Sequence, residues 1–228
     1  MSQSSRLLLE KALLAQAAVT SWITVARQCP ARIPQSLINS VRERMIVQTA
    51  QQWGWTTDIT PSVDVDSLSK LRFDAKSLAS MALAEDKAGF ALEVLAARGG
   101  EHASLSSSDT RRATAARLMS AATGSTDLRQ QVYDVTSLIS NPDSTQDQAT
   151  GLLTPTAAVV EMDCARSITK TLAATATATA TSSSTTATKT TRRLSKNASL
   201  SLLLTLAEYH LWTAIQWGYP AFNSVFLT

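Results

Sequence analysis

The side chains best suited to metal binding or nucleophilic chemistry are few in this sequence: His102, His210, Cys29 and Cys164. Neither histidine has a second His or Cys at ligand spacing, and Glu208 is the one carboxylate so placed relative to His210. His210 shares an apolar stretch with Trp212, so we expect a packed core residue; His102 follows a glycine pair, so we expect a solvent-facing loop residue. The two cysteines indicate neither a disulfide scaffold nor a CxxC zinc site, and we predict no metal site.

The remaining candidates for catalysis are a serine run, 106–108, and the loop carboxylates Asp64 and Asp66. The serine run lacks the setting of a nucleophile elbow, and the two aspartates have no evident apolar pocket to tune their pKa values. The one glycine pair, Gly99-Gly100, is not followed by the Lys-Ser/Thr of a phosphate-binding loop, and no dinucleotide fingerprint is present. We expect a protein that is not an enzyme, with no cofactor and no small-molecule substrate.

Helical periodicity predicts four helices in the first 140 residues. The first spans about 5–28 and ends at a Cys-Pro pair, and the second spans about 34–53, so the two form an antiparallel hairpin. The third spans about 78–98, is weakened by Gly89 and ends at the glycine pair. The fourth opens at about residue 110, capped by a preceding Ser or Asp, and continues to about residue 139. These helices predict an all-α fold with a four-helix-bundle-like core.

The rest of the chain differs in composition. Residues 56–73 contain a proline and alternating acids, which predicts a crossing loop with a short strand. Residues 172–191 are a low-complexity Thr/Ala tract that we expect to be mobile in a free subunit and ordered by neighbouring subunits. A last helix is predicted over 200–217. We therefore divide the chain into a helical core (1–140), a basic Thr/Ala-rich insert (141–198) and a C-terminal helix with an aromatic tail (199–228).

The composition of the chain excludes several classes of protein. The chain has 228 residues, a formal net charge of +3 and only 17% charged residues, which excludes a charge-rich disordered chain and a charged coiled coil. Residues 61–110 are locally acidic, whereas 164–207 contain six basic residues and no acid. A polyanion could dock on such a segment, but six dispersed bases can equally serve to keep a Ser/Thr-rich stretch soluble.

Two apolar segments raise the question of membranes and targeting. Residues 199–217 are the most apolar stretch, but Glu208 and His210 interrupt it, so we expect a packed helix and no membrane span. Residues 1–28 begin with an apolar run that Glu10 and Lys11 break early. This pattern argues against secretion, but it is still compatible with an organelle-targeting segment.

Several aromatic and charged positions occur in an order that resembles the coat proteins of rod-shaped plant RNA viruses, of the tobamovirus and benyvirus type. The resemblance covers about residues 20–140 and rests on Trp22, Arg42 and Arg44, Trp53-Gly54-Trp55-Thr56, Arg72-Phe73, Asp86 with Phe90-Ala91-Leu92, and Asp109-Thr110-Arg111-Arg112. It implies a helical bundle, an aromatic-rich loop after the first helix pair, and an ion pair between the third and fourth helices. Asp86 would be the acid of that pair, and Arg111 or Arg112 the base.

The same resemblance implies single-stranded RNA as a partner. Its phosphates would be bound by Arg111 and Arg112, with Arg42, Arg44 and Arg117 as further contacts. Two arginines at a helix N-terminus would make a plausible phosphate cradle, since the backbone N–H groups there point the same way. They could equally be a solvated helix start, and Asp86 a surface or capping residue. The five tryptophans could stack on bases, but their helical placement favours packing.

The sequence therefore predicts a structural coat protein that polymerises helically around single-stranded RNA, with many copies of itself as partners and the virion and host cytoplasm as its location. The main alternative is a helical subunit of a large cellular assembly, for example in an organelle, that uses the same apolar faces for heterologous contacts. Arginines gathered at one end of the helices would favour the first interpretation, and cleavage of the N-terminal segment would favour the second.

Overall fold

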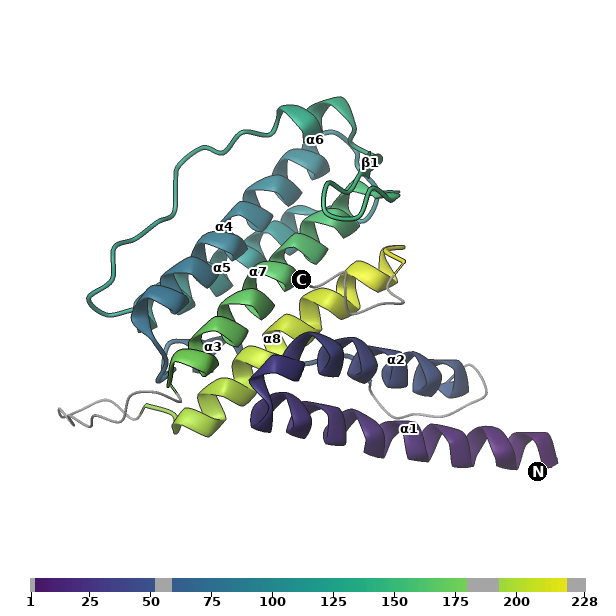
Figure 1. Ribbon diagram of the computed structural model, residues 1–228. Helices are drawn as coiled ribbons and strands as arrows, with labels where there is room; N and C mark the ends of the chain where they lie inside the picture. The colour runs from purple at the N-terminus through teal and green to yellow at the C-terminus, as the bar shows by residue number, and fades with distance from the viewer. Residues whose placement is uncertain (1–2, 52–58, 180–192, 221–228) are drawn as a thin grey trace.

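A computed structural model describes residues 3–51, 59–179 and 193–220, and confirms an all-α fold (Figure 1). Within these ranges the long helices are α1 (Gln3–Gln28), α2 (Ile33–Gln51), α4 (Ala75–Ala97), α5 (Leu105–Ala121), α7 (Thr156–Thr179) and α8 (Lys196–Gln216). Shorter elements join them: the 3-10 turn η1 (Pro30–Arg32), α3 (Val65–Leu68), α6 (Thr136–Ser140), and the antiparallel strands β1 (Ser144–Gln146) and β2 (Leu153–Pro155).

Polar side chains fix where several helices begin. Asp74 accepts a hydrogen bond from the Ser77 backbone N–H at the start of α4, and Ser195 accepts one from the Ala198 N–H at the start of α8. At the start of α5, Ser104 and Ser107 form a reciprocal capping box. Each of these interactions satisfies a backbone N–H that has no partner within its helix, so the register of the helices is fixed locally.

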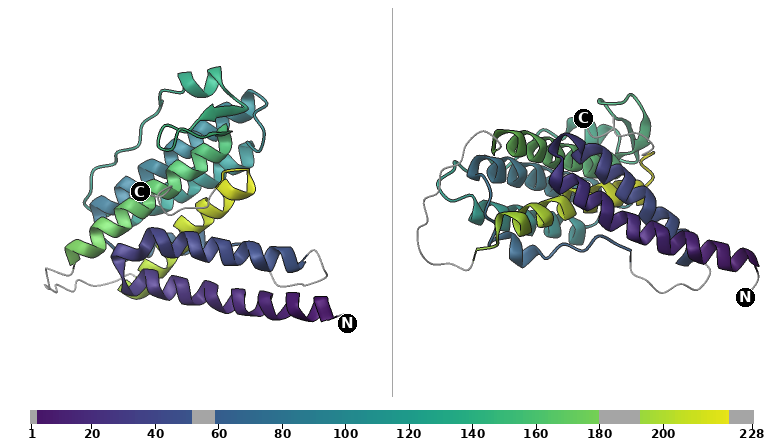
Figure 2. Two further views of the ribbon diagram at one scale, coloured as in Figure 1. Left: turned by 45° about the vertical axis from the view of Figure 1, so that its right-hand side comes forward. Right: turned by 60° about the horizontal axis from the view of Figure 1, so that its bottom comes forward.

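The helices form two groups (Figure 2). Helices α4, α5, α7 and α8 run side by side and make the body of the molecule, and the α1–α2 hairpin packs across α8 with its N-terminal end directed away from the body. One large apolar cluster runs through both groups, with residues from α2, α4, α7 and α8 at its centre. Six long helices therefore share one core among the described residues, where the sequence had indicated four core helices, a separate insert and a C-terminal helix.

Two predicted boundaries are wrong. The fourth helix ends at Ala121, because Gly124, with a φ of +84°, breaks it. Residues 122–135 then cross the molecule to α6, and we call this segment the irregular connection. Residues 141–179 are no insert: they contain the β1–β2 hairpin and α7, and side chains such as Met162 and Ile168 are fully buried in the core. The Thr/Ala tract is helical as far as Thr179, and its remaining residues to 191 lie outside the described ranges.

Other expectations fare better. The first three helices and the last one lie within a few residues of their predicted bounds. Trp212 is buried and Trp217 packs against the core, as predicted for packing residues, whereas Trp53 and Trp55 lie outside the described ranges. The segment 59–73 holds the short helix α3 where a strand was expected. No helix in the described part of the chain combines the length and apolar character that a membrane crossing needs.

Candidate functional site

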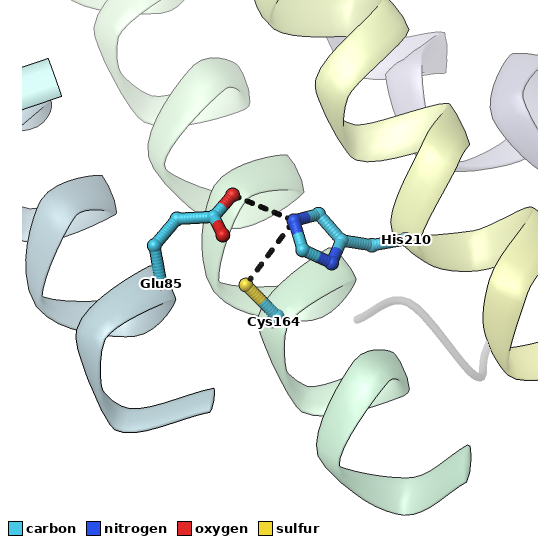
Figure 3. Close-up of side chains that lie close together, drawn as sticks. All are labelled: Glu85, Cys164 and His210. Carbon is cyan, nitrogen blue, oxygen red and sulfur yellow. Dashed lines mark hydrogen bonds and ion pairs between the residues drawn. The ribbon is translucent and has the colours of Figure 1, made fainter. Parts of the chain in front are cut away.

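Four ionisable side chains meet inside the body, and each comes from a different helix: Glu85 from α4, Arg111 from α5, Glu161 from α7 and His210 from α8. All four are buried. Cys164, one turn after Glu161 on α7, borders the same space, and Figure 3 shows Glu85, Cys164 and His210 converging from three helices. We call these five residues the central cluster.

His210 is held between two carboxylates. Its Nδ1 lies 2.7 Å from Glu161 Oε2, and its Nε2 lies 2.7 Å from Glu85 Oε1. Because an ionised carboxylate can only accept, both ring nitrogens donate and the imidazole is positively charged. Burial acts to lower the pKa of His210, but the negative charges of Glu85 and Glu161 outweigh it, so the pKa is raised well above its ordinary value.

Arg111 supplies a second positive charge. Its Nε donates to Glu161 Oε1 at 3.1 Å, its Nη1 lies 3.9 Å from Glu85 Oε2, and its guanidinium carbon lies 4.7 Å from the centre of the Tyr209 ring. Burial acts to raise the pKa of Glu161, but Arg111 and His210 lower it below its ordinary value. Two cations and two carboxylates thus cancel, which is the condition under which buried charges are tolerated.

Cys164 is the remaining polar group of the central cluster. Its Sγ lies 3.5 Å from His210 Nε2, and burial raises the pKa of the thiol to about 11, so the thiol is protonated near neutral pH. One donor atom each from Glu85, Cys164 and His210 lie within 4.8 Å of one another. Among the described residues, these three form the group whose donor atoms are placed to hold a metal ion.

A glycine lets α5 approach α4 closely at this point. A Cβ added to Gly89 would lie 2.9 Å from the Cγ of Arg112, 3.1 Å from the Ser108 carbonyl oxygen and 3.3 Å from the Cβ of Arg111. Such distances leave no room for a methyl group. Gly89, which weakened the sequence prediction of the third helix, therefore has a packing role: it brings the start of the Arg111 side chain against α4, from where it reaches the two glutamates.

A second ion pair ties the α1–α2 hairpin to the body. Arg44 on α2 binds both carboxylate oxygens of Glu208, with Nε–Oε1 at 2.8 Å and Nη2–Oε2 at 3.0 Å, and its Nη1 donates to the Ile59 carbonyl oxygen at 2.5 Å. Ser40 also donates to Glu208. This bidentate geometry uses the donors of Arg44 inside the protein, so Arg44 supports the fold and is not presented to a phosphate.

A third network lies where β1 ends. Asp147 is buried and binds Arg166 of α7, with Oδ2–Nη2 at 2.6 Å and Oδ1–Nη1 at 3.2 Å, and it also accepts a hydrogen bond from Tyr219 Oη. Burial acts to raise the pKa of Asp147, but the hydrogen bonds from Arg166 and Tyr219 outweigh it and bring the pKa to about 2. This network fixes the β1–β2 hairpin to α7 and to the residues after α8.

The predicted pair of Asp86 with Arg111 or Arg112 is wrong. Asp86 accepts a hydrogen bond from Tyr133 Oη at 2.7 Å, and Arg111 binds the preceding acid, Glu85, together with Glu161. Neighbouring residues of a helix point about 100° apart, so residue 85 faces the helices of the body while residue 86 faces the irregular connection. An ion pair between α4 and α5 does exist, one residue away from the predicted acid.

The five arginines predicted to bind RNA are not equivalent. Arg111 is buried, so its predicted contact with RNA is wrong, and Arg44 is engaged by Glu208. Neither Arg111 nor Arg112 lies at a helix N-terminus, because α5 begins at Leu105, so the phosphate-cradle argument does not hold. Three of the five are exposed: Arg42, Arg112, which pairs with Glu93, and Arg117, which pairs with Asp66.

His210 is a fully buried core residue, as predicted, and His102 is exposed with φ +67° and stacks on Trp217. Sequence reasoning missed Glu85, Glu161 and Cys164. A signal was present: Glu161 and Cys164 share one face of the helix with apolar residues such as Ala158, Ala165 and Ile168, and an acid on an apolar face must find a partner. Placing residues 141–198 in an insert removed that face from consideration.

Comparison of the chain with models of known protein families, with curated proteins and with solved structures found no match.

Proposed function

We propose that the chain is a structural subunit that assembles with copies of itself into a helical coat around single-stranded RNA. The observation that carries this proposal is a pair of unlike apolar surfaces on opposite sides of the molecule. The first, the α1 surface, consists of Leu7, Leu13 and Leu14 near the free end of the hairpin, with Leu7 62% and Leu14 72% exposed. Leu7 and Leu14 are seven residues apart and so lie on one side of α1.

The second surface lies on and beside the irregular connection, on the far side of the body from the free end of α1 in all three views (Figures 1 and 2). It consists of exposed Leu128, Val132 and Ile139, and we call it the connection surface. Two different patches that bind each other make a heterologous contact, which repeats without closing unless the rotation happens to form a ring. Contact with a second copy would also explain why these exposed apolar side chains are tolerated on the surface.

RNA is the partner that an open array of this kind would enclose. The three exposed arginines, Arg42, Arg112 and Arg117, are the candidates for phosphate contacts. Exposed ion pairs contribute only about 0–1 kcal/mol, so a phosphate can replace Glu93 or Asp66 at little cost. Phosphate contacts carry no base code, and few are needed per subunit when each subunit covers a short piece of RNA.

Assembly is tested with the double substitution Leu7→Gln and Leu14→Gln. Electron microscopy of the purified protein with RNA should show filaments for the unsubstituted chain and dispersed subunits for the variant. Leu153→Gln is the matched control, because Leu153 is equally exposed at 74% but belongs to neither surface. A protein that stays monomeric with RNA across pH and ionic strength would contradict the proposal.

RNA binding is tested separately. The pair Arg112→Gln and Arg117→Gln should reduce the RNA protected from nuclease and lower the slope of log affinity against log salt by about 1 for each lost contact. The control is Arg32→Gln, since Arg32 is an exposed arginine that is not among the proposed phosphate contacts and belongs to neither apolar surface. Equal protection in the double variant and the control would exclude these two arginines as RNA contacts.

A further inference from the structure

We propose that Glu85, Cys164 and His210 form a binding site for a divalent transition metal, with Zn²⁺ as the ion that suits their chemistry best. The site would tie α4, α7 and α8 together through one ion. The inference does not depend on the proposed function, because it concerns only the centre of the body. It rests on the placement of the donor atoms and on a buried carboxylate oxygen that accepts no hydrogen bond, its nearest cation being Arg111 at 3.9 Å.

The donor set and its spacing match zinc. Carboxylate oxygen, thiolate sulfur and imidazole nitrogen are the three donor types that proteins offer to Zn²⁺. For tetrahedral bonds of ordinary length, the sulfur and nitrogen donors should be roughly 3.5 Å apart and the oxygen and nitrogen donors roughly 3.3 Å apart. The observed separations are 3.5 Å for Cys164 Sγ to His210 Nε2 and 2.7 Å for Glu85 Oε1 to His210 Nε2. The second distance must open on binding by about 0.6 Å to reach ordinary bond lengths. The donor atoms of Glu85 and Cys164 lie within 4.8 Å of each other.

Glu85 carries the observation that points to a ligand. Its Oε2 is buried and has no hydrogen-bond partner, although a buried carboxylate oxygen without one is costly. Figure 3 shows the carboxylate of Glu85 directed toward His210 and Cys164, with both oxygens on that side. A metal ion between the three side chains would engage Oε1, and Oε2 would be placed to complete the coordination.

The surroundings supply the outer contacts that metal sites use. Glu161 Oε2 lies 2.7 Å from His210 Nδ1, so it would fix the ring with Nε2 facing the metal, as carboxylates commonly do for zinc-bound histidines. Glu161 is in turn held by Arg111. A groove of about 620 Å³ between α4, α7 and residues 130–138 is lined in part by Cys164, so it borders the proposed site at that residue.

Binding leaves the cluster without net charge. Without metal, the charges of Arg111 and His210 balance those of Glu85 and Glu161. A divalent ion would replace two protons, one from the Cys164 thiol and one from His210 Nε2, and both would be released to solvent. The ion then adds two positive charges while the thiolate adds one negative charge and the imidazole loses one positive charge. The sum is again zero, so the buried site pays no penalty of uncompensated charge in either state.

The test uses Co²⁺ as a spectroscopic substitute for Zn²⁺. The full chain is unfolded, refolded with Co²⁺ and freed of unbound ion, and its metal content and absorption spectrum are measured. We expect one Co²⁺ per chain, a thiolate-to-cobalt charge-transfer band in the near ultraviolet, and intense visible bands of a four-coordinate ion. Zn²⁺ should displace the Co²⁺ and abolish the bands.

Two cysteine variants provide the matched comparison. Cys164→Ser should abolish the charge-transfer band, whereas Cys29→Ser, which changes the exposed cysteine, should leave it intact. Glu161→Gln should keep the band and weaken metal affinity roughly 10- to 100-fold, as expected for a residue that orients a ligand. If Cys164→Ser does not fold, the unsubstituted chain still decides: refolded protein without bound Co²⁺, or with Co²⁺ but no sulfur band, overturns the proposal. A band lost with Cys29→Ser also overturns it.

Discussion

The body of the molecule and helix α1 of the hairpin are held in place by different kinds of contact. In the body, four helices meet through buried charges, each of which has a defined partner and distance. In α1, the buried side chains among those described are three alanines, Ala12, Ala15 and Ala26, while leucines at its free end are exposed. Charged contacts specify one arrangement of helices, because any displacement leaves a buried charge unpaired. Contacts between small apolar residues specify distance but offer little area to bury.

This contrast suggests a division of labour. The body has its buried charged side chains paired within the subunit, and in the proposed assembly the free end of the hairpin would gain burial from a neighbouring subunit. The ion pair Arg44–Glu208 is the joint between the two regions. Substitutions in the body, at the Arg44–Glu208 joint and in the hairpin separate the contributions of these regions to the free energy of unfolding.

The largest effect is expected in the body. Arg111→Gln leaves Glu161 and Glu85 with His210 as their single cation, so one buried negative charge is uncompensated. Removal of one partner from a buried pair typically costs about 3–5 kcal/mol. The neighbouring substitution Arg112→Gln breaks only an exposed pair with Glu93 and should cost about 0–1 kcal/mol. Urea denaturation of the two variants measures both values. Equal losses would show that the central cluster does not stabilise the body as described.

A smaller loss is expected at the joint. Arg44→Gln leaves the buried carboxylate of Glu208 with Ser40 alone, which should cost about 2–3 kcal/mol. Hydrogen exchange should become faster in α1 and α2 than in α4 and α7, because the hairpin loses its attachment while the central cluster stays intact. Arg42→Gln, an exposed arginine on the same helix, is the control. Uniformly faster exchange across all helices would contradict a separate joint.

The Asp147 network predicts a pH dependence. Its folded pKa of about 2 lies below the ordinary value of about 3.9 for an unfolded chain. A group whose pKa is lowered by folding contributes stability above its unfolded pKa, and that contribution disappears as the pH falls from about 4 toward 2. Asp147→Asn should therefore be less stable than the unsubstituted chain at neutral pH, and the difference should shrink in that window. A difference that is constant from neutral pH to pH 2 would exclude this role.

The smallest effect on the subunit is expected at the free end of the hairpin. The double substitution Leu7→Gln and Leu14→Gln changes exposed side chains, so the free energy of unfolding of the monomer should change by no more than about 0.5 kcal/mol per site. Thermal unfolding at a concentration where the chain is monomeric measures this. A loss of several kcal/mol would mean that these leucines stabilise the subunit itself, and the contrast between body and hairpin would fail.

Helical periodicity, together with the Pro and Gly residues that end a helix, was sufficient to predict the helices that begin and end at strong local signals. The Cys29-Pro30 pair ended the first helix and Gly99 the third, because each residue acts on the backbone at its own position. The extent of α7 was not predictable in this way. Its many threonines have low intrinsic helix preference, and burial of side chains such as Met162 and Ile168 in the core stabilises the helix against α4 and α8.

The central cluster could not be predicted from the sequence for a related reason. His210 was correctly assigned to the core, but its two carboxylate partners lie 49 and 125 residues away in the chain. The choice between Glu85 and Asp86 depended on the rotation of α4, which is set by how Gly89 packs against α5. The resemblance proposed arginines as RNA contacts, but it could not separate buried Arg111 from exposed Arg112.

Those long separations also set an order of events during synthesis. Residues 85, 111 and 161 are made well before residue 210, so until α8 has emerged from the ribosome two glutamates share a single arginine in an incomplete interior. Domains made of such distant contacts fold slowly, since a large loop must close before any contact is gained. The hairpin of α1 and α2 needs only local contacts and can form early, but its anchor on Glu208 arrives with α8 as well. Docking of α8 is therefore the last step in forming the subunit. The α1 surface and the connection surface reach their final relative positions only after α8 docks.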